Sequence, residues 1–115
     1  MGTDSVFKIY DNSIGISFQW KKNAKLTQVI FRDTGFHLSK EEIVFFLEEI
    51  QLSKQKKTCK TCSLGTECRS MLLKTPFYKV SMAVSLTELN AIEDLLRGTL
   101  FQLDLNEYLQ ELCKN

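Results

Sequence analysis

The chain of 115 residues has little proline, tryptophan or histidine, with one residue of each. It has no apolar run near the roughly 18 residues that a membrane span needs, and residues 1–10 lack the basic region and apolar run of a secretory signal. It also has almost no net charge, because 15 basic residues are balanced by 14 acidic ones. We therefore expect a cytoplasmic protein with neither a membrane nor nucleic acid as its partner.

Sequence motifs that carry catalysis are absent as well. The chain has no glycine-rich phosphate loop, no zincin helix and no serine or cysteine nucleophile motif. His37, the single histidine, has no acid-base partner that spacing identifies, and the glutamate pairs fit helix caps or solvated helix faces. We assign no catalytic residue and expect a protein that is not an enzyme.

What is present is the composition of an ordinary globular domain, with 43% hydrophobic and 25% charged residues. The length suits one hydrophobic core, since a single core usually serves about 100 to 150 residues. We expect residues 1–115 to form a single domain.

The first half of the chain indicates strands at 6–10, 13–20, 27–32 and 36–38, separated by short polar turns. Residues 13–20 and 36–38 alternate apolar and polar side chains, as half-buried strands do, while 6–10 and 27–32 are rich in residue types that favour strands. Ser39 and Glu42 then have the spacing of a capping box, in which each side chain accepts a backbone N–H at the start of a helix. Apolar residues follow on one helical face, at Ile43, Phe46, Leu47 and Ile50.

The second half repeats this order. Strands at 71–73 and 78–84 surround a turn at Pro76, and Ser85 and Glu88 repeat the capping-box spacing. Gly98 has the residue type that commonly ends a helix. Aligning the two caps sets Leu38, Ser39, Glu42, Ile43 and Phe46 against Val84, Ser85, Glu88, Leu89 and Ile92.

The repeat predicts an α+β fold made of two ββα-type halves, residues 13–53 and 69–98. A single half buries its sheet on only one helix, so we expect the halves to share one mainly antiparallel sheet with the helices packed on one face. A connector at 54–68 joins them. A short C-terminal helix at 104–113, capped by Asp104, is predicted to dock over a sheet edge or a helix groove.

Part of this pattern is shared with a known family. The matching residues are Gly15, Gln28, Val29, Ile30, Phe31, Gly35, Leu38, Ser39 and Glu42. On them the chain from Ser13 to Glu49, about a third of its length, resembles a group of small bacterial proteins of unknown function. Members often carry Cys-x-x-Cys in a turn where this chain has no cysteine, so the resemblance implies a local fold and no metal site.

The strongest candidate for a metal site is a cluster of cysteines in the connector. Cys59 and Cys62 are separated by two residues, a spacing that lets two thiolates bind one tetrahedral zinc ion, and Cys68 follows in the same loop. Cys113 or His37 would complete the four ligands. The second spaced pair of a full zinc signature is missing.

Other interpretations of these cysteines remain open. They also fit reduced thiols of a connector or a disulfide, and the neighbouring Lys57 and Lys60 favour thiolate in a redox pair. Cys113, next to Leu112, fits a small buried hydrophobic residue. We therefore assign no cofactor and keep zinc as an alternative.

A candidate interface lies on the first helix. Val44, Phe45 and Leu52 fall off its main apolar face, which is more apolar surface than contact with one sheet needs. A second copy of the chain, another protein or the C-terminal helix would cover them. The sequence thus predicts a small soluble domain that acts as a non-catalytic protein-binding or self-associating module. The alternative is a small structural-zinc domain that uses the cysteine loop.

Overall fold

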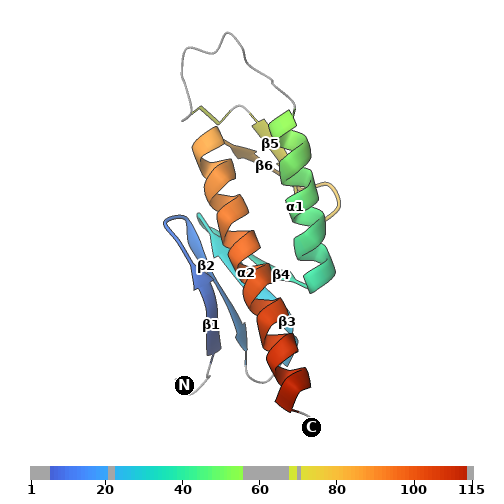
Figure 1. Cartoon of the computed structure of the whole chain (residues 1–115). Helices are drawn as coiled ribbons and strands as arrows, with labels where there is room; N and C mark the ends of the chain where they lie inside the picture. The colour runs from blue at the N-terminus through green and yellow to red at the C-terminus, as the bar shows by residue number, and fades with distance from the viewer. Residues whose placement is uncertain (1–5, 21–22, 56–67, 70, 114–115) are drawn as a thin grey trace.

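The computed structural model describes residues 6–20, 23–55, 68–69 and 71–113. Within these ranges the protein has the predicted α+β class, as Figure 1 shows. The elements are β1 (Val6–Asp11), β2 (Gly15–Trp20), β3 (Asn23–Phe31), β4 (Thr34–Leu38), α1 (Lys40–Gln55), β5 (Met71–Lys74), β6 (Ser81–Val84) and α2 (Leu86–Cys113). Neither helix has the length and hydropathy needed to cross a bilayer.

Strands β1 to β4 form an antiparallel meander in which each strand pairs with the next. Asn12 shapes the first turn, because its Oδ1 accepts the N–H groups of Ile14 and Gly15 at 3.0 and 3.2 Å. Both helices lie on one face of this sheet (Figure 1). The buried sheet residues are Ser17, Thr27, Val29, Phe31, Phe36 and Leu38.

Both predicted capping boxes are confirmed. The Ser39 N–H donates to Oε1 of Glu42 at 2.8 Å, and the Glu42 N–H donates to Oγ of Ser39 at 3.2 Å. Ser85 and Glu88 make the same pair of bonds at 3.0 and 3.1 Å. Since losing a cap typically costs about 1 kcal/mol, these short local motifs fix where α1 and α2 begin.

The buried apolar side chains form one cluster, to which the sheet, both helices and the β5–β6 hairpin all contribute. Three aromatic rings, from Phe31, Phe36 and Phe46, meet between the sheet and α1. Phe77, from the β5–β6 turn, stacks on Phe36 with ring centroids 5.8 Å apart. The second hairpin therefore helps to close the core beside β4.

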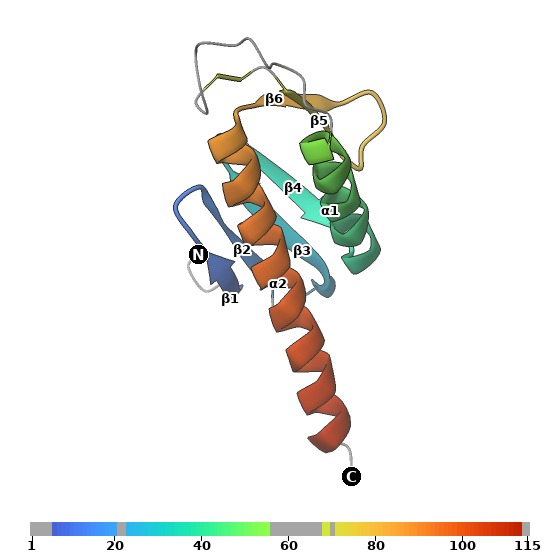
Figure 2. The ribbon, with the colours of Figure 1, turned by 45° about the horizontal axis from the view of Figure 1, so that its top comes forward.

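The prediction of one shared sheet is wrong. The β5–β6 hairpin forms its own two-stranded sheet beside α1 (Figure 2), although Leu73 and Val84 on its inner face are fully buried. Alternation in a sequence shows which face of a hairpin is buried, but not which strand edge the hairpin joins. Strand β6 also begins later than predicted, at Ser81, so Tyr78 and Val80 are exposed in the turn.

The predicted helix end at Gly98 and the separate helix at 104–113 are also wrong, because α2 runs unbroken from Leu86 to Cys113. Gly98 is required for a different reason: a Cβ atom there would lie 2.5 Å from the ring of Tyr10. The missing side chain lets β1 approach the helix. Asp104 lies inside α2, where its carboxylate forms an ion pair with Lys40 instead of a cap.

Candidate functional site

The C-terminal half of α2 extends beyond the sheet, as Figure 2 shows. Before this point the helix buries Leu89, Ile92, Leu95, Leu96, Thr99 and Leu103 against the rest of the protein. From Asp104 to Cys113 every side chain is exposed. The predicted docking of 104–113 over a sheet edge or a helix groove is therefore wrong, and this segment forms surface.

Five large apolar side chains lie along this exposed part of α2. They are Phe101, Leu105, Tyr108, Leu109 and Leu112, which we call the terminal stripe, with exposed fractions of 63%, 38%, 61%, 47% and 55%. Steps of four, three and four residues, from Phe101 to Leu112, keep side chains on one face of a helix. The terminal stripe is thus a continuous apolar ridge.

Closer to the N-terminus of α2, strand β1 covers the same face of the helix. Positions seven residues apart share a face, so Gly98 is in line with Leu105 and Leu112. Strand β1 packs on Gly98 through the ring of Tyr10, whose hydroxyl donates to Oδ2 of Asp94 at 3.0 Å. This hydrogen bond is the main cause of the raised pKa of Tyr10. The terminal stripe is the uncovered continuation of a face that β1 occupies.

The charge around the terminal stripe has one sign. Between Gly98 and Cys113 the sequence has three acidic residues, Asp104, Glu107 and Glu111, and no lysine or arginine. Lys40 of α1 donates to Asp104 and, at 3.0 Å, to Glu107. Hydrogen bonds to Asp104 and then to Glu107 raise the pKa of Lys40. One ammonium group thus serves two carboxylates, those of Asp104 and Glu107, and this pair keeps a net negative charge.

The candidate interface on α1 is exposed, in keeping with the position of its side chains away from the main apolar face of the helix. Val44, Phe45 and Leu52 have exposed fractions of 39%, 40% and 49%. The C-terminal half of α2, the alternative cover, does not bury them. They lie on a different helix from the terminal stripe, and their role as an interface stays a prediction.

The structure describes three of the candidate zinc ligands, Cys68, Cys113 and His37, and does not bring Cys68 and Cys113 together. Cys59 and Cys62 lie outside the described residues; Cys68 is half-buried and Cys113 is exposed rather than buried. Cys68 adjoins Arg69, which bonds to the first turn of α2, whereas Cys113 is the last residue of that helix. A helix of 28 residues rises by roughly 40 Å, and zinc ligands lie about 2 Å from the ion. Cys113 and Cys68 of one chain therefore cannot share an ion.

No group of three or more metal-ligating side chains occurs within the described part of the chain. His37, the other candidate for the fourth ligand, is exposed on β4 between the buried residues Phe36 and Leu38. It therefore points to the sheet face opposite the helices, as the alternation predicts.

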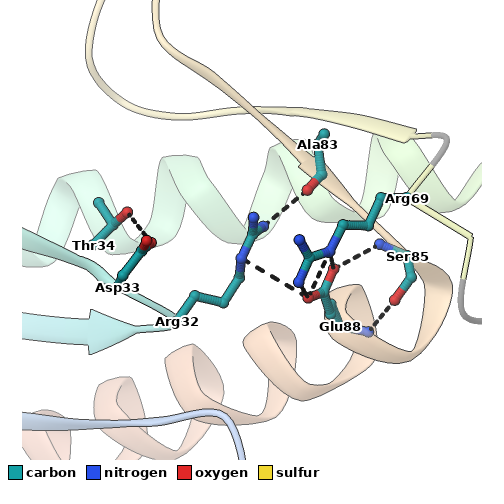
Figure 3. Close-up of polar contacts among 7 residues, drawn as sticks. All are labelled: Arg32, Asp33, Thr34, Arg69, Ala83, Ser85 and Glu88. Carbon is teal, nitrogen blue, oxygen red and sulfur yellow. Dashed lines mark hydrogen bonds and ion pairs between the residues drawn. The ribbon is translucent and has the colours of Figure 1, made fainter.

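A cluster of charges that the sequence does not reveal lies at the start of α2 (Figure 3). The carboxylate of Glu88 accepts hydrogen bonds from Nε and a terminal nitrogen of Arg69, at 3.0 and 2.7 Å. Nε of Arg32 lies 3.8 Å from the same carboxylate, and its guanidinium donates to the carbonyl oxygen of Ala83 at 2.8 Å. Arg32 occupies the β3–β4 turn with a positive φ of 58°. The capping box predicts the place of Glu88, but nothing local predicts its arginine partners.

This cluster holds three segments together and offers little reactivity. Burial acts to raise the pKa of Glu88, but hydrogen bonds from Arg69 and the Ser85 N–H, with the charge of Arg32, hold it below its usual value. A carboxylate with a lowered pKa and several hydrogen-bond donors is a poor proton acceptor. Its own carboxylate also occupies the anion-attracting start of α2. The cluster fastens the β3–β4 turn to the second hairpin and to α2.

Comparisons of the chain with protein-family models, with curated proteins and with solved structures find no match. The resemblance to small bacterial proteins of unknown function stays a prediction.

Proposed function

We propose that the protein is a non-catalytic protein-binding or self-associating module, and that the terminal stripe is its docking surface. The observation that carries this proposal is an unbroken helix whose last ten residues, Asp104 to Cys113, are all exposed while the apolar pattern continues along one face. Soluble proteins seldom leave a long contiguous apolar patch without a partner.

Other exposed apolar side chains add to the terminal stripe. Phe7, on β1, adds a further exposed aromatic side chain with an exposed fraction of 54%. Val44, Phe45 and Leu52 on α1 provide a second surface for the same role. Covering these side chains by another chain would remove apolar area from water, which is the main driving force of association.

The test compares the wild-type protein with the double variant Leu105→Gln and Leu112→Gln, which keeps helix propensity and removes two apolar side chains of the terminal stripe. The matched control is Leu72→Gln, at an exposed leucine on β5 with an exposed fraction of 71%. Sedimentation equilibrium measures self-association, and affinity capture from a lysate of the source organism measures partner binding.

We expect a copy of the chain or a protein partner that binds the wild type and the control but not the double variant. Circular dichroism should show the same helix content for all three proteins. If all three are monomeric and capture the same proteins, the terminal stripe is not a docking surface.

A further inference from the structure

We propose that the terminal stripe binds an amphipathic helix of a partner protein whose apolar face is flanked by lysine or arginine. The proposal deepens the proposed function and rests on it, because it names the class of partner for the same surface. It follows from the charge beside the terminal stripe, from its shape and from what β1 leaves accessible.

The charge selects a basic partner. Asp104 and Glu107 lie beside the terminal stripe and share one ammonium group, that of Lys40, and the C-terminal end of a helix carries partial negative charge. Lys40 offsets only part of this charge. Charge complementarity across an interface selects partners and speeds their encounter, so a flank of lysine or arginine fits here. An anionic lipid surface or a nucleic acid would be repelled.

The shape of the terminal stripe selects a helix. The distance along the helix axis from Phe101 to Leu112 is about 16 Å, or three turns, with one apolar side chain at each step of three or four residues. A second helix with the same spacing can set its side chains between those of this ridge. Because the terminal stripe lies along one helix, an amphipathic helix buries more of it than an irregular loop does.

A second copy of α2 fits less well than a basic helix. In an antiparallel pair the flank with Asp104 and Glu107, which share one lysine, would face the same flank of the other copy, and like charges there are destabilising. In a parallel pair the helices would stay adjacent upstream, where Tyr10 and strand β1 already occupy the face at Asp94 and Gly98. The surface that remains suits a different chain.

The experiment uses the full chain and two synthetic helical peptides of about 18 residues, long enough to span the terminal stripe. The peptides share the same leucine positions and differ only in their flanking residues, which are lysine in one and glutamate in the other. Fluorescence anisotropy of the labelled peptides gives the affinities. We expect the lysine peptide to bind at least about tenfold more tightly, and salt to weaken its binding several-fold.

Variants of the protein locate the binding. The double variant Leu105→Gln and Leu112→Gln should bind the lysine peptide about tenfold or more weakly than the wild type does. Glu111→Lys should weaken this binding about two- to fivefold, the usual size of a surface charge effect. Glu48→Lys is the matched control, because Glu48 is exposed on α1 beside the other apolar surface; it should leave the affinity unchanged.

Two results overturn the basic-helix proposal. One is equal affinity for both peptides, and the other is a wild-type dimer that Leu105→Gln with Leu112→Gln dissociates. The second result leaves the terminal stripe as a docking surface and assigns it to a second copy. If the double variant binds every probe as the wild type does and has the same oligomeric state, both this proposal and the proposed function are wrong.

Discussion

The two halves of α2 have the same regular backbone and opposite surroundings. In the first half, Thr99 is fully buried; its hydroxyl donates to the Leu95 carbonyl at 2.6 Å and lies 2.6 Å from Oγ of Ser17. In the second half, from Asp104 on, no side chain is buried. Extending a helix that has already formed costs far less than starting one, so packing of the first half can support the second. The comparison separates residues that stabilise the protein from residues that are available to a partner.

The largest expected difference between the halves is in stability. Leu96→Ala removes a fully buried side chain and should lower the free energy of unfolding by about 2 to 5 kcal/mol. Leu109→Ala makes the same chemical change at a side chain that is 47% exposed. It should change the free energy of unfolding by less than about 0.5 kcal/mol. Urea unfolding followed by circular dichroism measures both values. Equal losses would show that the end of α2 is packed in solution.

A smaller difference concerns pH. Because Arg69, the Ser85 N–H and Arg32 lower the pKa of Glu88 against the effect of burial, its ionised form stabilises the folded state. That stability is fully present above the unfolded pKa near 4.5 and is lost as the pH falls through the lower folded pKa. Glu88→Gln should therefore cost about 1 kcal/mol at pH 7 and give a shallower loss of stability on acidification.

The control for this pH effect is Glu48→Gln at an exposed position of α1, which should follow the wild-type curve. Glu93 leaves some pH dependence in every variant, since Lys54 and Arg97 lower its pKa against the effect of burial. The measurement is the free energy of unfolding between about pH 3 and pH 7. Curves of equal slope for wild type and Glu88→Gln would contradict the role of the arginine cluster.

The smallest expected effect is on metal content. If purified protein contains zinc held by Cys59, Cys62 and Cys68, Cys113→Ser should leave the zinc content per chain unchanged, because Cys113 lies at the far end of α2 from Cys68. Elemental analysis of protein purified without a chelator measures the zinc content per chain. The matched control is Cys68→Ser. Zinc lost with Cys113 would require ligands from two chains.

Features set by local sequence were predictable. The serine and glutamate of each capping box are three residues apart, so both helix starts follow from a few neighbouring residues. The strands of the first sheet also follow from local sequence, because alternation indicates β2 and β4, and strand-favouring residue types indicate β1 and β3. The sequence also places Val44, Phe45 and Leu52 away from the main apolar face of α1, where the structure leaves them exposed.

Features set by distant residues were not predictable. Gly98 has the residue type of a helix end, yet Tyr10 requires it, and these residues are far apart in the sequence. The terminal stripe has the pattern of a docked helix, and a pattern does not show whether the protein supplies the surface to dock on. Glu88 was predicted as a cap, while its partners Arg32 and Arg69 come from separate segments.

The contacts between β1–β2 and α2 also constrain how the chain folds during its synthesis. Tyr10 bonds to Asp94 across 84 positions of sequence, and Ser17 meets Thr99 across 82. The first four strands therefore leave the ribosome well before the helix that packs on β1 and β2. Until α2 has been made, the face of these strands that it covers remains accessible to water and to chaperones, and native closure of the core is among the last steps of folding.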